Sequence, residues 1–93
     1  MAINWSNAAR HDVARIFDFN AAYDPRRAAT IDGRLAQRAE SCALNPMVGR
    51  LVVGSIRDRS LTDNQYVIRY RVDSEDEITI LGIGHTRENS EHP

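Results

Sequence analysis

The pattern of apolar and polar positions predicts a helical first half and an extended second half. Residues 7 to 22 carry apolar side chains at helical spacing, with polar residues on the other side. They are Ala9, Val13, Ile16, Phe17 and Ala21. Residues 25 to 43 repeat this pattern with Ala28, Ile31, Leu35, Ala39 and Cys42. Ser6 or Asn7 can cap the first stretch. Between the two stretches, Asp24 is a suitable N-cap and Pro25 fits a first helical position, so we expect an antiparallel pair of helices.

From residue 50 onward the period changes to two, which is typical of strands. We expect strands over residues 50–61, 66–72 and 77–84, with turns at 62–64 and 73–76 and a bend or bulge at Gly54. A short strand is also expected over residues 2–5. In the strand YVIRYRV, alternation predicts that one face packs on the helices, namely Tyr66, Ile68, Tyr70 and Val72. The last strand is apolar on both faces, which favours a position inside the sheet.

The predicted order is β-α-α-β-β-β, an α+β fold with a helix hairpin packed on one face of a mostly antiparallel sheet. The 93 residues suffice for one modest core. We expect a single domain over residues 1–88 and a frayed polar tail over residues 89–93.

Composition narrows the classes of function. The formal net charge of −1 gives no overall basic field, so we expect no direct specific DNA binding. The single Cys42 excludes an internal disulfide, and scattered histidines give no metal-ligand spacing, so neither metal nor cofactor is expected. No apolar run is long enough to span a bilayer, and we expect a cytoplasmic protein without a membrane partner.

The candidate chemistry lies in arginines, since all twelve basic residues are arginine. Arg69 and Arg71 share one face of their strand, and Arg57 and Arg59 share one face of the preceding strand. Together with Arg87 they are expected to cluster on the sheet face away from the helices, where guanidinium groups suit RNA phosphates or an acidic protein. The alternative is that these arginines only form ion pairs across the hairpins, with partners among Asp58, Glu75 and Glu77.

His85 stands at the end of the last strand. It is a candidate general acid or base, or a hydrogen-bonded structural residue. Cys42 is expected in the core.

Four motifs in order resemble the RelE/ParE superfamily of type II toxin–antitoxin toxins. They are N-P-x-x-G-R at residues 45–50, Gly54 with Arg57 and Asp58, Y-V-I-x-Y-x-V at residues 66–72, and His85 followed by Arg87. The resemblance covers residues 3–87. Within the superfamily the chain is more similar to ParE than to RelE, because it has no lysine and no tyrosine after Tyr70.

A ParE-like toxin implies a binding protein that inhibits DNA gyrase, without an active site of its own, and that a ParD-like antitoxin neutralises. The resemblance then implies these target-binding candidates: Arg57, Arg59, Arg69, Arg71, His85 and Arg87. The apolar stripes of the helices supply the antitoxin-binding candidates Val13, Phe17, Ile31 and Leu35.

Two alternatives stay open. A RelE-like, ribosome-dependent mRNA endonuclease would use Arg57, Arg69, Arg71 and His85 as catalytic candidates. A toxin-fold protein without toxicity would only bind a partner.

Overall fold

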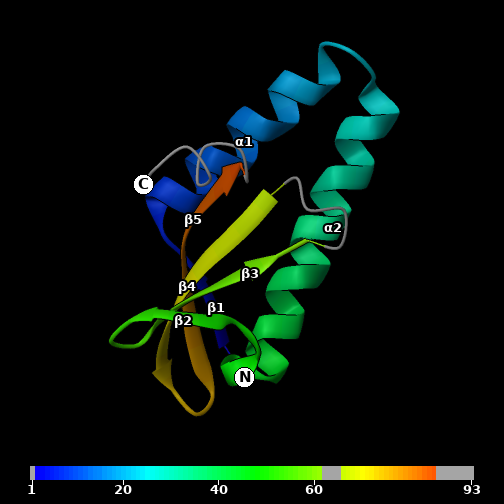
Figure 1. Cartoon of the computed structure of the whole chain (residues 1–93). Helices are drawn as coiled ribbons and strands as arrows, with labels where there is room; N and C mark the ends of the chain where they lie inside the picture. The colour runs from blue at the N-terminus through cyan, green and yellow to red at the C-terminus, as the bar shows by residue number, and fades with distance from the viewer. Residues whose placement is uncertain (1, 62–65, 86–93) are drawn as a thin grey trace.

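The computed structural model describes residues 2–61 and 66–85. Two helices pack on one face of a mixed sheet with the strand order β1-β5-β4-β3-β2 (Figure 1). The elements are β1 (Ala2–Trp5), α1 (Asn7–Ala21), α2 (Pro25–Leu44), the short 3-10 helix η1 (Pro46–Val48), β2 (Arg50–Val53), β3 (Ile56–Ser60), β4 (Tyr66–Ser74) and β5 (Glu77–His85). This confirms the predicted α+β fold.

Both helices begin at the predicted capping residues. The Ser6 hydroxyl accepts a hydrogen bond from the Ala9 amide at 3.0 Å, and the Asp24 carboxylate accepts one from the Arg26 amide at 3.0 Å. Each bond satisfies a backbone N–H that the helix itself leaves without a partner. With Pro25 at the first position, α2 starts where the sequence indicates.

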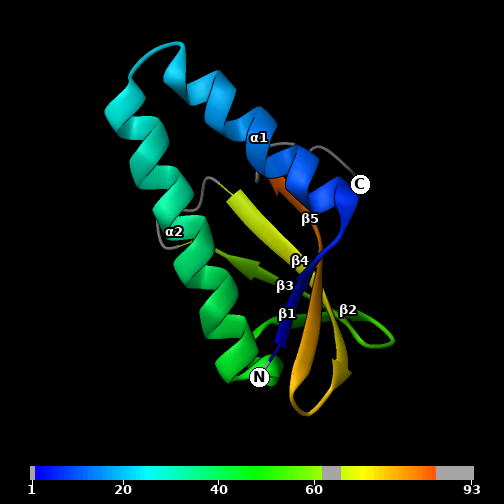
Figure 2. The same ribbon diagram turned by 180° about the vertical axis from the view of Figure 1, so that it is seen from behind.

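The sheet is antiparallel except at one edge, where β1 runs parallel to β5. The last strand, β5, therefore lies inside the sheet, between β1 and β4, as its apolar character on both faces predicted. Figure 2 shows β1 crossing in front of β5 before the chain enters α1.

The stretch 50–61 forms two strands instead of the single bent strand expected. Gly54 adopts a φ of +55°, in the left-handed region that glycine enters without steric cost, and it turns the chain back on itself. The strands on either side, β2 and β3, then pair antiparallel. The turn Gly54–Ser55 is so short that the apolar run before it and the polar run after it look like one continuous strand.

The core lies between the helix hairpin and the sheet. Its largest fully buried side chains are Tyr70, Leu35, Ile68, Ile78, Ile80 and Cys42. The inward face of β4 is the predicted one, and Cys42 is buried as expected. Burying an Ile or Leu side chain contributes about 1.5–3 kcal/mol, so these contacts account for much of the hydrophobic driving force.

Candidate functional site

The register of β3 against β4 places two of the predicted cluster's arginines on the helix side of the sheet. Arg57 lies opposite Tyr70, and Arg59 lies opposite Ile68. Residues directly opposite on antiparallel strands point to the same face, and both partners are fully buried beneath the helices. The prediction of one cluster on the open face is therefore wrong for this pair, because alternation within each strand does not reveal how two strands are aligned.

The other two arginines, Arg69 and Arg71, do point to the open face, and each has a carboxylate partner. Nε and Nη2 of Arg69 donate to the two oxygens of Asp58 at 2.8 and 2.9 Å, and this hydrogen bonding raises the pKa of Arg69. Nε of Arg71 donates to Asp73 at 2.7 Å. The hydroxyl of Thr79 donates to the same carboxylate, and Thr79, followed by Arg71, lowers the pKa of Asp73. The open face is thus a set of ion pairs rather than a purely cationic surface.

Arg57 stabilises the turn between α2 and β2. Its Nη1 donates to the carbonyl of Gly49 at 2.8 Å and lies 3.4 Å from that of Met47. The buried hydroxyl of Tyr70 donates to the Pro46 carbonyl at 2.7 Å and accepts from the Gly49 amide at 2.9 Å. A Cβ at position 49 would lie 2.6 Å from this hydroxyl, so only glycine fits. The N-P-x-x-G-R stretch is therefore a structural turn that β3 and β4 hold in place.

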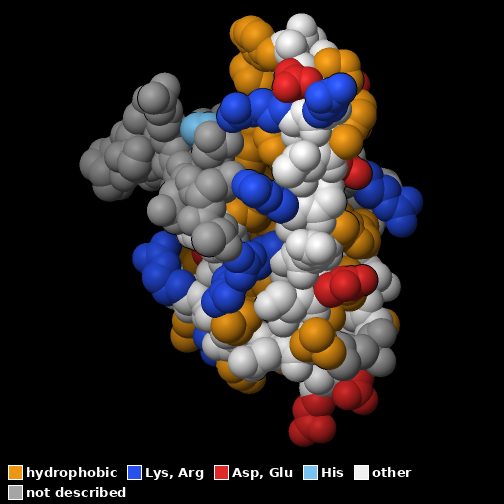
Figure 3. All heavy atoms as spheres, turned by 90° about the vertical axis from the view of Figure 1, so that its right-hand side faces the viewer, with side chains coloured by type: hydrophobic (Ala, Val, Ile, Leu, Met, Phe, Trp, Pro, Cys, Tyr) orange, Lys and Arg blue, Asp and Glu red, His pale blue; other side chains and the backbone are white. Residues whose placement is uncertain are grey.

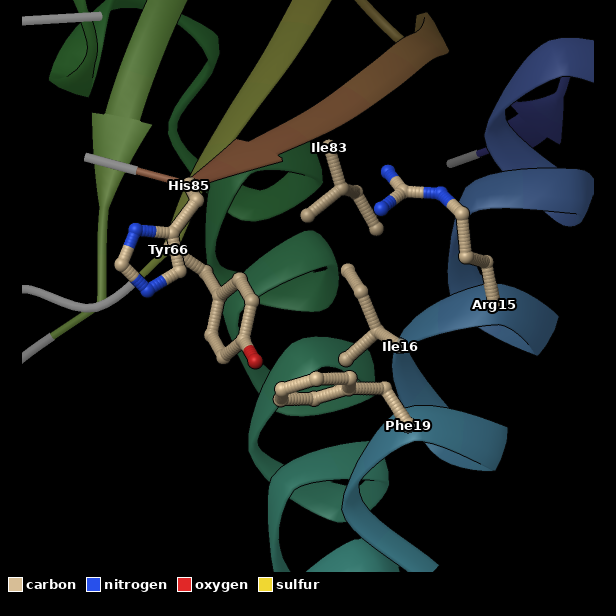
Figure 4. A pocket seen from close by; sticks show the side chains of 6 residues that line it. All are labelled: Arg15, Ile16, Phe19, Tyr66, Ile83 and His85. Carbon is tan, nitrogen blue, oxygen red and sulfur yellow. The ribbon is translucent and has the colours of Figure 1, made fainter. Parts of the chain in front are cut away.

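His85 lies at the mouth of a hollow of about 180 Å³ between α1 and the ends of β4 and β5. Its ring meets that of Tyr66 edge to face, with centroids 5.3 Å apart. Figure 4 shows Arg15 on the opposite side of the hollow and apolar side chains between the two basic groups. The full lining is Arg15, Ile16, Phe19, Tyr66, Ile83 and His85. The hollow, hereafter the His85 pocket, therefore combines an apolar floor with a basic rim.

Two contacts from α1 hold this pocket in shape. The side-chain amide of Asn20 donates to the Tyr66 hydroxyl at 3.2 Å and to the carbonyl of Ile16 at 2.8 Å. The carboxylate of Asp12 accepts from the backbone amide of Ile83 at 2.9 Å. Because β1 pairs with β5 only as far as Ile80, this carboxylate occupies the place of a missing strand.

A second hollow, of about 250 Å³, lies where the two helices meet the end of β1. Its lining is Trp5, Arg10, Val13, Asp32, Leu35 and Ala36. We call it the helix groove.

The structure separates the four predicted antitoxin contacts. It brings Val13 and Leu35 together in the helix groove, and Phe17, which is 39% exposed, follows Val13 one turn later on the same flank of α1. Ile31 packs in the core and does not line the groove, and Leu35, which does line it, is itself only 1% exposed, so Val13 and Phe17 offer most of the contact surface.

Sequence reasoning missed the exposed apolar residues around β2, which are Leu44, Met47, Leu51, Val52 and Val53. The available signal was the break in alternation at L-V-V, since consecutive apolar residues in an edge strand must leave some of them in solvent. Arg87, the turn at 62–64 and the tail 89–93 lie outside the described residues.

Among the described residues, no group of three or more His, Cys, Asp or Glu side chains is placed to hold a metal ion. None of the described helices combines the length and the apolar character needed to cross a membrane.

Comparison of the chain with known proteins identifies its family. The family model described as "ParE toxin of type II toxin-antitoxin system, parDE" matches residues 3–90. No curated protein matches the chain. Among solved structures, a chain of the "Chromosomal ParDE TA system from P. aeruginosa" is similar, with a TM-score of 0.77 and 24% sequence identity over 91% of this chain and 95% of that one. Since the family model covers nearly the whole sequence, the chain belongs to the ParE toxin family of type II toxin–antitoxin systems.

Proposed function

We propose that this toxin inhibits DNA gyrase and that a ParD-type antitoxin neutralises it. The observation that supports this most strongly is the match to the ParE toxin model over residues 3–90. The similar solved structure comes from a ParDE system and supports the same fold.

The helix groove is the proposed antitoxin site. It offers half-buried Val13, and the exposed ring of Phe17 lies one turn further along α1, a combination that suits the apolar face of an amphipathic helix. Arg10 and Asp32 line the same groove and provide one positive and one negative charge that can fix the orientation of the partner. A permanent toxin–antitoxin complex typically buries about 2,000 Å² or more, so the groove would form the centre of a larger interface.

A substitution that fills the groove without disturbing the core tests this site. Ala36 lines the groove and is exposed, so Ala36→Arg places a long side chain where the partner helix would lie. The matched control is Ala14→Arg, at an exposed position of α1 that does not line the groove. We expect Ala36→Arg to abolish co-purification with the ParD-type product of the adjacent gene, and we expect Ala14→Arg to retain it. Equal binding by both variants would refute the site.

The His85 pocket is the proposed contact for gyrase. A pocket with aromatic and aliphatic walls and a charged rim suits an anchoring side chain of a protein target, because interface energy concentrates in such desolvated spots. Inhibition by binding needs a complementary surface, whereas RNA cleavage needs an acid and a base held in one site.

The gyrase proposal is tested by supercoiling and by trapped gyrase–DNA cleavage complexes. We expect the purified toxin to inhibit supercoiling by gyrase or to accumulate gyrase–DNA cleavage complexes. The His85→Ala variant should show an effect at least tenfold weaker and should still bind the antitoxin. Cleavage of mRNA on translating ribosomes, lost in His85→Ala, would instead establish the endonuclease alternative. An inert protein that binds only the antitoxin would establish the non-toxic alternative.

A further inference from the structure

Three arginines lie along one flank of α2. Arg27, Arg34 and Arg38 are separated by seven and four residues, spacings that bring side chains to the same side of a helix. In Figure 3, which faces this side of the molecule, basic side chains follow the length of the helix. The opposite flank carries Asp32 and Ala36 and forms the helix groove. The helix therefore has one basic flank, on the side away from α1.

The helix-side arginines of β3 continue this basic flank onto the sheet. Burial raises the pKa of the Cys42 thiol, while the positive charges of Arg59 and Arg38 act in the opposite direction. Arg57 and Arg59 act in the same way on Tyr70, whose pKa burial also raises. Arg38 of α2 and Arg59 of β3 thus act on the same buried thiol, and Arg59 lies on the helix side of the sheet, opposite Ile68.

Together these five residues form what we call the arginine stripe: Arg27, Arg34, Arg38, Arg57 and Arg59. It holds five of the twelve arginines of a chain whose net charge is −1. At its centre the Nε of Arg59 is buried and has no hydrogen-bond partner among the described residues. A buried donor without a partner is unfavourable, so a carboxylate that reaches it gains more than one bound at the open surface.

We propose that the arginine stripe docks an acidic helical segment of a partner protein. Arg27 and Arg38 are about 16 Å apart along the axis at 1.5 Å per residue, so a partner helix of about three turns spans them. Carboxylates spaced by four and seven residues on that helix would face the guanidinium groups, which bind carboxylates through paired hydrogen bonds. This proposal does not depend on the identity of the toxin's target.

A single-stranded nucleic acid is the less suitable ligand. Proteins that bind single strands combine basic grooves with exposed aromatic rings on which bases stack. Tyr70, which lies opposite Arg57 of the stripe, is fully buried and makes both of its hydroxyl hydrogen bonds within the protein. The chain as a whole also lacks the excess positive charge that draws proteins to nucleic acids.

Arg27, Arg34 and Arg38 already take part in interactions within the chain, so an acidic partner would add to or replace them. Exposed ion pairs are screened by salt over a Debye length of about 8 Å at physiological ionic strength. Binding at the stripe should therefore weaken as salt is raised, whereas binding in the apolar helix groove should change little.

Fluorescence anisotropy with the full chain tests the proposal. The probe is a labelled helical peptide with glutamates spaced by four and seven residues, and a glutamine version of the same peptide serves as its control. The stripe variant is Arg27→Gln with Arg34→Gln. The control variant, Arg26→Gln with Arg50→Gln, removes the same charge at two exposed positions outside the stripe. All four positions are exposed, so both variants should fold.

We expect the acidic peptide to bind the wild-type chain, the stripe variant to bind it about tenfold more weakly, and the control variant to stay within about twofold. Equal losses in both variants would show a general charge effect and overturn the proposal. Tighter binding of single-stranded RNA or duplex DNA than of the acidic peptide would overturn it in favour of a nucleic acid. No binding of the acidic peptide at low salt would also overturn it.

Discussion

The hydroxyl of Tyr70 should contribute more to stability than any other single polar atom discussed above. It is fully buried and joins the Pro46 carbonyl to the Gly49 amide, the former at 2.7 Å and the latter at 2.9 Å. The change Tyr70→Phe keeps the ring in place and leaves both backbone groups without this partner. A buried polar group left unsatisfied costs about 1–3 kcal/mol. Since water reaches the partly buried Pro46 carbonyl more easily, we expect a total loss of about 2–4 kcal/mol.

Tyr66→Phe provides the matched control. It also removes a buried tyrosine hydroxyl, but this hydroxyl accepts one hydrogen bond, from Asn20, whose amide still donates to the Ile16 carbonyl. The expected loss is about 0.5–1.5 kcal/mol. Urea unfolding followed by circular dichroism measures both values, and a Tyr70→Phe loss no larger than the Tyr66→Phe loss would refute the reasoning.

A double-mutant cycle adds a second check on this turn. In Gly49→Ala, the new Cβ would approach the Tyr70 hydroxyl to 2.6 Å and the Asp58 carbonyl to 2.9 Å. Removing the hydroxyl relieves only the first of these contacts. The two changes together should therefore destabilise the protein less than the sum of the separate changes, by roughly 1 kcal/mol. Strict additivity would show that the hydroxyl and Gly49 do not interact.

Three further predictions follow from local geometry. Gly54→Ala should lower the free energy of unfolding by about 1–2 kcal/mol because φ at this position is +55°; the cost comes from the backbone alone, since no atom lies within 4 Å of the new Cβ. Asparagine tolerates this conformation better than alanine, so an equal loss in Gly54→Asn would contradict the argument. In thermal melts, Arg69→Ala should destabilise the protein by about 1 kcal/mol more than Arg71→Ala, because the Asp58 side chain that loses its partner is only 9% exposed, whereas that of Asp73 is 21% exposed. Equal losses in the two variants would contradict the argument. Burial raises the folded-state pKa of Cys42 above its ordinary value of 9.0, so the contribution of the thiol to stability is complete below that pH and is lost as pH rises through the folded-state pKa. Urea unfolding at a series of alkaline pH values should therefore show a smaller loss of stability in Cys42→Ala than in the wild type, and an equal loss would exclude Cys42 as its source.

Most of the fold could be predicted from the sequence, because local signals and the hydrophobic pattern agree. The caps Ser6 and Asp24, the helical stripes and the alternation in β4 each specify an element whose position the structure confirms. The turn at Gly54 could not be placed with certainty, since a single glycine fits a bulge as well as a turn. Its conformation depends on how β2 pairs with β3, a contact between residues that no local period reports.

The arrangement of the candidate sites was harder to predict for the same reason. Alternation correctly assigned Arg69 and Arg71 to one face, and Arg57 and Arg59 to one face, but relating the two strands requires their register. The register observed sends the pairs to opposite sides of the sheet. The basic flank of α2 was not predicted, although the spacing of Arg27, Arg34 and Arg38 could have indicated it; its continuation onto β3 depends on helix packing.

The residues that identify the family in this chain mostly build the scaffold. Gly49 leaves room for the Tyr70 hydroxyl, Arg57 donates a hydrogen bond to the Gly49 carbonyl, and Asp58 forms an ion pair with Arg69. The helix groove, the His85 pocket and the arginine stripe, in contrast, are formed mainly by residues outside the motifs. A loss of toxicity in Arg57→Ala would therefore not identify a target contact, because the same change removes a support of the turn before β2. Only variants whose stability stays unchanged, such as those at the exposed Ala36 or Arg34, can separate target recognition from folding in this protein.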